Sequence, residues 1–423
     1  ILSGPAGGIV GAVQTSKRAG FNKIVTFDMG GTSTDVAHYA GEYERELDSE
    51  IAGARMRVPV LAIHTIAAGG GSLLSFDGMS YRVGPESGGA NPGPACYRRG
   101  GELTVTDANV ILGKIQPQYF PAVFGKDANL PLDKEIVVTK FTQLAATIAT
   151  ATDNYRTPEQ VASGFIAIAV NNMANAIKKI SLQRGYDVTR YVLCCFGGAG
   201  AQVACLIADV LGITKIFIHP YAGVLSAYGI GLADIRVTKV ESVEMALTSD
   251  VIPKLESLME SLESKARKER EEETRELVVK KVNLKYEGTD FTLTINFNSD
   301  IAIMKQNFEA EHQIRYGFIQ PEKDLVIESA LVELIQKMDT PEEPIINRTR
   351  PINEPPQSIA TVQMFALDKW HDAKVYHRED LQPKDCIKGA AIIVEKINTI
   401  IIEPNWQVRT NEHNYLILEK NTL

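Results

Sequence analysis

An apolar run that ends in two adjacent glycines constrains this chain more than any other feature of its sequence. Residues 24–27 are typical of a buried strand, and directly after them come Asp28, Met29, Gly30, Gly31, Thr32, Ser33, Thr34 and Asp35. Adjacent glycines let the backbone adopt φ > 0, so that successive N–H groups can converge on one anion. The hydroxyls that follow add further donors. The segment therefore predicts an anion-binding turn at the end of a strand.

Asp28 and Asp35 place a carboxylate on either side of this turn. Hard cations take oxygen ligands and bridge phosphate oxygens, so this pattern favours a nucleotide accompanied by Mg²⁺. We predict Asp28 as the leading catalytic residue, which either holds Mg²⁺ through a water molecule or orients the attacking nucleophile, and Asp35 as the second candidate. The alternative is an ordinary hairpin in which Thr and Asp residues only shape the turn.

A second glycine cluster follows another apolar run. Residues 191–196 are typical of a buried strand, residues 201–212 of an apolar helix, and between them lie Gly197, Gly198, Ala199 and Gly200. A dinucleotide-binding Rossmann unit fits poorly, because its third glycine would fall on Val203 and the next strand ends at His219 rather than at an acid. No GxxxxGK[ST] loop occurs. We therefore predict that one glycine turn holds phosphates and the other meets the nucleoside.

Eight family-like segments are distributed over most of residues 1–330. They are residues 1–8, 27–35, 64–72, 83–97, 104–109, 182–187, 223–229 and 285–290. In these segments the chain resembles the hydantoinase A/oxoprolinase family, and within it the ATP-dependent 5-oxoprolinases. Two positions depart from the family pattern: Val203 stands where a His is common, and Leu73 where a basic residue is common.

The resemblance implies an α/β fold with a nucleotide-binding lobe related to actin, Hsp70 and the sugar kinases (RNase H-like). Residues 1–240 would form the second lobe of this ATP-binding domain, with a loop-rich insertion at about 50–130 that is dense in glycine and proline. Thr157, Pro158 and Gln160 predict the start of a helix with a capping box. Changes of periodicity predict an α+β domain over 241–325 and a mainly β domain over 326–423. The α+β domain would contain a hairpin and a long helix from 249 to about 273, whose apolar residues at 252, 255, 259, 262 and 266 recur at helical spacing.

The function implied by the resemblance is ATP-dependent opening of a lactam or imide ring. The substrate expected is 5-oxoproline, which would yield glutamate, ADP and phosphate through phosphorylation of the amide oxygen, a step of glutathione metabolism. Candidate substrate contacts lie in the matching segments: His64, Gly69, Gly70, Gly71, Asp107 and Asn109. For the three glycines, tight backbone packing is an equal alternative.

The resemblance also implies partners. Relatives carry a preceding lobe with its own glycine loop, and a hydantoinase B-like subunit or fused domain for the hydrolysis step; we also consider a homo-oligomer. The chain opens on Ile1 without an initiator Met, a signal region or an apolar span of membrane length, which predicts a fragment of a larger polypeptide. A lone half of an ATP clamp should bind ATP weakly and be inactive, because transition-state charge must be met from both walls.

Composition narrows the partners further. The formal net charge is −8 and no basic tract occurs, which argues against nucleic acid and anionic membranes. The five cysteines are odd in number and form no CxxC pair, which indicates reduced thiols in the cytoplasm.

Two rival functions remain at this stage. Among enzymes, an N-methylhydantoinase-type ATPase or the ATP-using subunit of a ketone carboxylase would share these loops. In another class, the chain would be a non-catalytic, nucleotide-regulated binding module. The glycine- and proline-dense block over 64–109 argues against that module, because it is typical of a small-molecule lid rather than of a docking surface.

Overall fold

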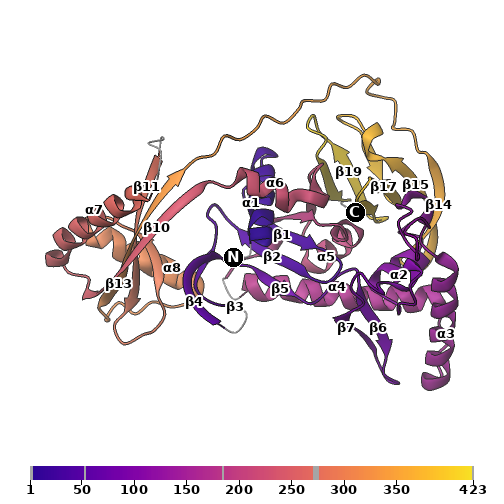
Figure 1. The fold of residues 1–423 in the computed structure, drawn as a ribbon, viewed down its shortest axis with the longest axis horizontal. Coiled ribbons are helices and arrows are strands. Elements are labelled where there is room, and N and C mark those ends of the chain that lie inside the picture. Colours follow the sequence, from indigo (N-terminus) through magenta and orange to yellow (C-terminus); the bar gives the residue numbers. More distant parts are fainter. Residues whose placement is uncertain (1–2, 52–53, 183–184, 270–275, 422–423) are drawn as a thin grey trace. The chain divides into compact units, whose positions relative to one another are not determined.

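The computed structural model describes residues 3–51, 54–182, 185–269 and 276–421, which divide into two compact units (Figure 1). Unit 1 consists of Ile1–Ser181, Asp187–Gly231 and Glu342–Leu423, and unit 2 of Leu182–Tyr186 and Leu232–Pro341. Unit 2 is thus an insertion in the sequence of unit 1. No helix among the described residues is both long and apolar enough to cross a membrane.

An eight-stranded mixed sheet forms the centre of unit 1, in the order β16-β19-β20-β9-β8-β1-β2-β5. Only the β9-β8 and β8-β1 pairs are parallel, so the carboxyl ends of these three strands lie at one edge. Their apolar side chains are buried, as expected for strands covered on both faces. The strands are β1 (Ile24–Met29), β2 (Thr34–Tyr39), β5 (His64–Ile66), β8 (Val192–Phe196), β9 (Lys215–Ile218), β16 (Cys386–Lys388), β19 (Trp406–Thr410) and β20 (Leu416–Lys420).

Helices cover both faces of this sheet. α1 (Ser3–Arg18) contacts β1, β2 and β8, while α5 (Ala204–Leu211) contacts β8 and β9. α6 (Leu225–Leu232) packs closely on α1, because Gly7, Gly11 and Gly229 bring the two backbones together; a Cβ at Gly11 would lie 2.8 Å from the Leu225 carbonyl oxygen. α1 and α6 both lie close to β1 in the ribbon (Figure 1).

The remaining elements of unit 1 surround this centre. The long helix α4 begins at the predicted capping box: Thr157 N–H donates to Gln160 Oε1 (3.1 Å), and Gln160 N–H donates to Thr157 Oγ1 (3.3 Å). The elements are α2 (Val105–Ile111), α3 (Lys134–Thr152), α4 (Pro158–Leu182), the hairpins β3 (Arg45–Ile51) with β4 (Ala54–Leu61) and β6 (Ser72–Phe76) with β7 (Tyr81–Ser87), and a second sheet of β14 (Ala360–Ala366), β15 (Lys369–His377), β17 (Ala391–Val394) and β18 (Thr399–Ile402).

The described residues of unit 2 form a four-stranded antiparallel sheet with two α-helices. The strand order is β10 (Ile235–Ala246), β13 (Leu325–Gln336), β11 (Glu276–Tyr286) and β12 (Leu293–Asn296), and the helices are α7 (Ile252–Lys268) and α8 (Ile301–Tyr316). The apolar stripe of α7 is buried, which confirms the helical periodicity; it consists of Ile252, Leu255, Met259, Leu262 and Ala266. The end of the expected helix near residue 273 lies outside the described residues.

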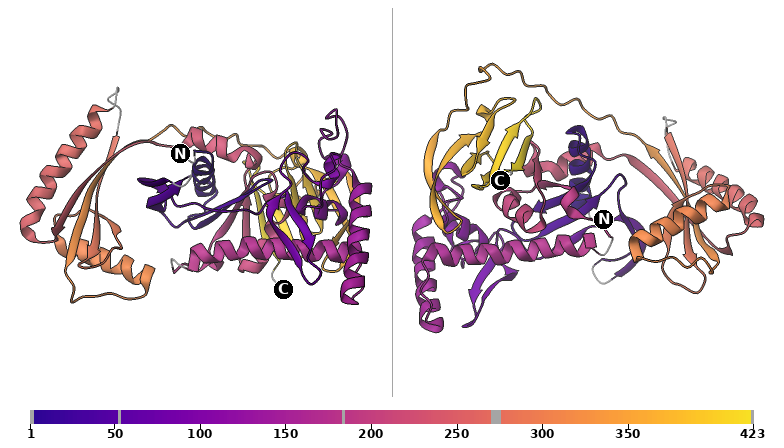
Figure 2. Two further views of the ribbon diagram at one scale, coloured as in Figure 1. Left: turned by 60° about the horizontal axis from the view of Figure 1, so that its bottom comes forward. Right: turned by 180° about the vertical axis from the view of Figure 1, so that it is seen from behind.

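The C-terminal hundred residues are divided between the two units, unlike the separate β domain expected over 326–423. β13 lies within the unit 2 sheet, whereas β16, β19 and β20 extend the central sheet of unit 1. The yellow C-terminal strands can be followed beside the rest of unit 1 in both further views (Figure 2). Periodicity identifies strands, but it carries no information about their partners in the sheet.

Candidate functional site

The parallel pairing of β1 and β8 brings the two predicted glycine turns together. Asp28 lies opposite Phe196 at the ends of these strands, and each strand runs directly into its turn. The N–H of Ala199, in the second turn, donates to the carbonyl of Met29 (3.0 Å). Gly197 has φ +82° and lies against the Asp28 side chain. The two turns are therefore adjacent at one edge of the sheet.

The first turn is closed by a hydrogen bond from Gly30 N–H to the Ser33 carbonyl (3.0 Å). Neither Gly30 nor Gly31 adopts a positive φ, so the backbone conformation expected for the glycine pair does not occur. Within the described part of the chain, the amides of residues 31–33 donate to no acceptor, and Gly31 and Thr32 are exposed. The turn therefore presents unpaired N–H groups, as an anion site requires.

Gly69, Gly70 and Gly71 support this turn from behind. Gly70 N–H donates to the Gly30 carbonyl (3.1 Å), and Gly71 N–H donates to the Gly31 carbonyl (2.6 Å). A Cβ at Gly69 would lie 2.6 Å from the Gly31 carbonyl oxygen. Glycine is needed here because the two backbone segments approach each other closely. This supports tight packing, rather than substrate contact, as the reason for the glycine run.

The hydroxyl groups of the first turn divide into two kinds. Thr34 is buried and donates to the Ala68 carbonyl (2.6 Å), so its hydroxyl serves the packing of the turn. Thr32 is exposed and Ser33 is half-buried, and neither side chain forms a hydrogen bond within the described residues. The predicted phosphate donors that remain accessible are therefore Thr32 and Ser33.

Asp28 and Asp35 lie directly opposite each other in the β1-β2 ladder. Burial raises the pKa of Asp28 to about 6; a hydrogen bond from Ser226 opposes this increase, and the charge of Asp35 adds to it. The Ser226 hydroxyl donates to Asp28 Oδ2 (3.2 Å), and the Thr65 hydroxyl donates to Asp35 Oδ1 (2.5 Å). A carboxylate with a raised pKa that lies beside a second carboxylate at a strand end is typical of a functional site.

Within the second turn, the glycines differ in exposure. Gly198 is exposed, and a Cβ there would meet no atom within 4 Å. Gly200 is buried, and a Cβ there would lie 2.9 Å from the Cys195 sulfur. Gly198 is therefore the position at which a ligand can approach the second turn, while Gly200 and the buried Ala199 serve packing.

Asp107 and Asn109 lie on α2 and are fully buried. Asp107 accepts hydrogen bonds from the N–H groups of Ala95 (3.0 Å), Cys96 (2.8 Å) and Thr104 (2.8 Å), and it completes the capping box of α2. Burial raises its pKa, and these hydrogen bonds oppose the increase. The structure thus places Asp107 as a helix cap, away from any exposed surface.

Asn109 and His64 form no hydrogen bond with Asp28 or Asp35 within the described residues. The Asn109 amide donates to Gln202 Oε1 (3.1 Å), just beyond the second glycine turn. His64 lies on β5 opposite Val36 and is half-buried. Because side chains alternate along a strand, His64 faces away from Thr65, which bonds to Asp35.

Sequence reasoning missed Ser226, the residue that contacts the Asp28 side chain. Apart from the family resemblance of residues 223–229, the sequence raised Ser226 only as a possible nucleophile. The serine does not lie in a GxSxG motif, and so no nucleophile was expected there. The missed signal is a serine near the start of a helix that is dense in small residues.

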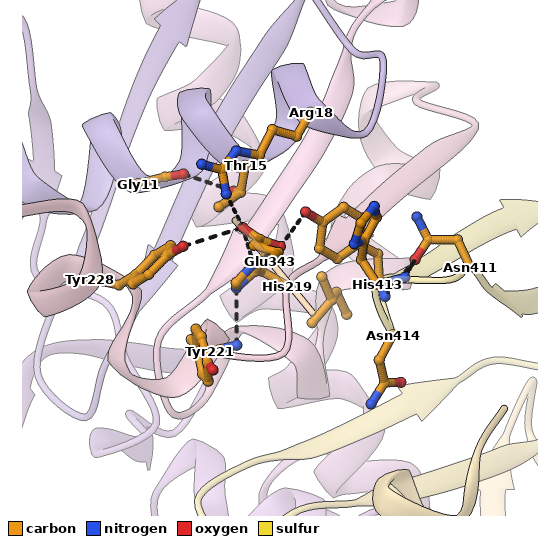
Figure 3. A network of polar contacts seen from close by, with 12 residues as sticks. Gly11, Thr15, Arg18, His219, Tyr221, Tyr228, Glu343, Asn411, His413 and Asn414 are labelled. Atoms are coloured by element: carbon orange, nitrogen blue, oxygen red, sulfur yellow. Dashed lines mark hydrogen bonds and ion pairs between the residues drawn. The ribbon is translucent and has the colours of Figure 1, made fainter. Parts of the chain in front are cut away.

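A partly buried polar cluster surrounds Glu343 (Figure 3). Glu343 pairs with Arg18 (2.6 Å), lies 3.3 Å from His219 Nε2, and accepts hydrogen bonds from the hydroxyls of Tyr228 (3.3 Å) and Tyr415. Burial acts to raise the pKa of Glu343, but these partners outweigh it and lower the pKa to about 2.

His219 connects this cluster to the glycine turn. Its Nδ1 accepts the N–H of Tyr221 (3.1 Å), which leaves Nε2 to carry the proton toward Glu343. The Ala222 N–H donates to the His219 carbonyl (3.0 Å), and the Gly197 N–H donates to the Ala222 carbonyl (3.0 Å). Burial lowers the pKa of His219.

Comparison with protein families decides the relationship. The Hydantoinase/oxoprolinase family matches residues 1–239, and the Hydantoinase/oxoprolinase C-terminal domain matches residues 249–421. The chain belongs to the hydantoinase/oxoprolinase family. This confirms the resemblance drawn from the motifs.

Curated relatives of this hydantoinase/oxoprolinase chain include two 5-oxoprolinases. The chain is 37% identical to that of Dictyostelium discoideum, over 96% of the chain and 34% of the relative. It is 36% identical to that of Saccharomyces cerevisiae, over 98% of the chain and 34% of the relative. The chain therefore spans about a third of the length of these relatives.

Solved structures share the fold. The ATP-dependent caprolactamase from Pseudomonas jessenii matches with a TM-score of 0.84 and 25% identity, over 99% of this chain and 61% of that one. A nucleotide-free acetone carboxylase matches with a TM-score of 0.75 and 23% identity, with the same coverage of 99% and 61%. The family fold is thus an α/β fold with mixed sheets.

Proposed function

We propose that this chain forms one wall of an ATP site and takes part in the ATP-dependent opening of a cyclic amide, with 5-oxoproline as the substrate. One observation carries the proposal: the turns after β1 and β8 meet at one sheet edge, with Asp28 between them and the amides of residues 31–33 unpaired. The 5-oxoprolinase relatives and the ATP-dependent caprolactamase support the nucleotide and the ring class.

The chemistry follows from the resistance of amides to hydrolysis. The amide oxygen of the lactam attacks the γ-phosphorus of ATP, the bond to ADP breaks, and the carbonyl carbon becomes electrophilic. Water adds to that carbon, and the ring C–N bond breaks as the nitrogen takes a proton. A second water converts the resulting acyl phosphate to glutamate and phosphate. Positioning and charge stabilisation provide most of the catalysis of such a transfer.

The residues of this chain have distinct roles in the proposal. The amides of residues 31–33 and the hydroxyls of Thr32 and Ser33 bind phosphate oxygens, and the nucleoside approaches the second turn at Gly198. Asp28 orients the attacking group, because its carboxylate lies between the two turns. The opposite wall comes from a preceding lobe related to actin-like ATPases, and ring hydrolysis takes place with a hydantoinase B-like partner in the cytoplasm.

The site also fits a Mg²⁺ ion. No group of three or more His, Cys, Asp or Glu side chains in the described residues is arranged to hold a metal directly. Asp28 and Asp35 nevertheless face each other, and the charge of Asp35 raises the pKa of Asp28, so a cation held through water would relieve their repulsion. When bound, Mg²⁺ would neutralise charge on the phosphates.

The test is a coupled assay on the intact enzyme that carries this chain. ADP and glutamate are measured with ATP, Mg²⁺ and either 5-oxoproline, a hydantoin, caprolactam, or a ketone with bicarbonate. We expect 5-oxoproline to stimulate ADP release and to yield glutamate in equal amount. ADP release that no lactam stimulates would refute the substrate, and a requirement for bicarbonate would identify a carboxylase instead.

A second measurement tests whether ATP is bound between two walls, of which this chain forms one. Titration of ATP into this chain alone and into the intact enzyme should give much weaker binding to the chain, because one wall is missing. Equal affinity, without turnover of any ring substrate, would favour the nucleotide-regulated binding module.

A further inference from the structure

We propose that Ser226 is a positioning residue, which holds the Asp28 carboxylate in the orientation that phosphoryl transfer needs. Ser226 lies 198 residues after Asp28 and reaches it from α6. The Ser226 hydroxyl donates to Asp28 Oδ2 (3.2 Å), and within the described residues this is the only hydrogen bond to the Asp28 side chain. The catalytic part of this inference rests on the proposed function.

The Asp28 carboxylate is fixed from two sides. Oδ2 faces Ser226 on α6, whereas Oδ1 lies beside the Cα of Gly197 in the second turn. A carboxylate held at only one oxygen keeps the other available for a water molecule or for the proton of an attacking group. Loss of the Ser226 hydroxyl would leave rotation about the Asp28 side chain limited only by packing.

Glycines of α1 set the position of Ser226. A Cβ at Gly8 would lie 2.8 Å from Ser226 Oγ and 2.8 Å from the ring of Phe196. A Cβ at Gly7 would lie 2.5 Å from the Ser226 carbonyl oxygen. The serine therefore occupies a narrow space between α1 and β8, and its hydroxyl has little freedom to move away from Asp28.

Three of the family-like segments contribute residues to the surroundings of the Asp28 carboxylate. Residues 1–8 supply the glycines of α1, residues 27–35 supply Asp28, and residues 223–229 supply Ser226. They are far apart in the sequence and meet at one carboxylate. Metal-ligand and catalytic carboxylates are commonly oriented by such neighbouring hydrogen-bond donors, whose loss lowers activity about 10- to 100-fold.

The experiment compares Ser226→Ala with Ser226→Thr in the intact enzyme, using steady-state kinetics and a crystal structure of each variant. For Ser226→Ala we expect kcat to fall about 10- to 100-fold while KM for ATP changes less than about threefold, because the phosphate-binding amides are unaltered. Ser226→Thr keeps a hydroxyl at the same position and should recover most of kcat. In the Ser226→Ala structure, Asp28 should leave its orientation.

A second variant, in α1, disturbs the hydrogen bond between Ser226 and Asp28. Gly8→Ala places a methyl group against Ser226 Oγ and should lower kcat in the same way. Gly4→Ala, in the same helix, is the matched control, because a Cβ there meets nothing within 4 Å. Gly8→Ala therefore remains informative even if Ser226→Thr does not fold.

The outcomes separate this inference from the proposed function. An unchanged Asp28 orientation in Ser226→Ala, or a change in KM alone, would overturn the role of Ser226. A wild-type enzyme without lactam-stimulated ADP release would overturn the proposed function, and the orientation of Asp28 in Ser226→Ala would still decide whether Ser226 positions it.

Discussion

Gly197 lies so close to Asp28 that a methyl group at position 197 would overlap the carboxylate oxygen Oδ1. The same residue has φ +82°, a conformation that only glycine adopts at little cost. The contact joins the end of β1 to the second glycine turn, and it explains why a glycine follows β8 directly.

We therefore expect Gly197→Ala to lower the free energy of unfolding by at least about 2 kcal/mol, from backbone strain and overlap together. Gly198→Ala is the matched control, because its Cβ would meet no atom within 4 Å. Urea unfolding of both variants checks this prediction. Equal stability of the two variants would contradict the described contact.

Asp28→Asn should stabilise the protein while it strongly lowers activity. The pKa of Asp28 is about 6 in the folded protein and 3.8 ordinarily, so the folded state binds the proton more tightly. The contribution of Asp28 to stability is therefore fully present below pH 3.8 and is lost as the pH rises through 6. Replacement by a neutral amide should add up to about 3 kcal/mol above pH 6.

Unfolding curves of the chain at about pH 4 and pH 8, with chelator present, check this expectation. The increase in the free energy of unfolding caused by Asp28→Asn should be large at about pH 8 and small at about pH 4. A gain that is equal at both pH values would indicate a packing effect rather than ionisation. In the intact enzyme, kcat should fall by about 100-fold or more.

Glu343→Gln should show the opposite pH dependence. The pKa of Glu343 is about 2 when folded and 4.5 ordinarily, so its ionised form stabilises the fold above pH 4.5 and this contribution is lost as the pH falls toward 2. We expect the substitution to cost about 2–3 kcal/mol at pH 7 and much less near pH 3. Glu342→Gln, at the exposed neighbouring position, should change the free energy of unfolding by less than about 0.5 kcal/mol. If Glu343→Gln lowers the free energy of unfolding equally at both pH values, the ionised form of Glu343 does not stabilise the fold as described.

Gly69→Ala should displace the first turn. Its methyl group would lie 2.6 Å from the Gly31 carbonyl oxygen, so the turn has to shift, and we expect ATP binding to the intact enzyme to weaken about tenfold or more. Gly31→Ala, where a Cβ meets nothing within 4 Å, should leave the free energy of unfolding within about 0.5 kcal/mol. Calorimetric ATP titration and thermal unfolding measure the two effects. Unchanged ATP affinity in Gly69→Ala would show that the glycine run does not support the turn.

The sequence predicted the features that are local. The strands at 24–27 and 191–196, the capping box of α4 and the buried stripe of α7 each follow from residues that are near one another in the chain, and the structure contains them all. The family resemblance was also confirmed.

Contacts between distant segments could not be predicted from local sequence patterns. Ser226 and Asp28 are separated by 198 residues, and the partners of Glu343 come from α1, α6, the residue after β9 and the residue before β20. Motif reasoning selected Asp107 for its chemistry, but the structure shows that its oxygens accept hydrogen bonds from Thr104 at the start of α2 and from the N–H groups of Ala95 and Cys96. Gly30 and Gly31 were expected to adopt a positive φ, but neither does, and the glycine that close packing requires at this turn is Gly69 in the neighbouring run.

The position of β20 has a consequence for synthesis on the ribosome. β20 pairs with β9, which pairs with β8, so the strands that carry the second glycine turn have an open edge until residues 416–420 have emerged. Unit 2, which is translated earlier, holds all four strands of its own sheet by residue 336. The inserted unit can therefore complete its sheet first, while the open edge of the central sheet of unit 1 remains exposed to edge-to-edge aggregation until the C-terminal strands are made.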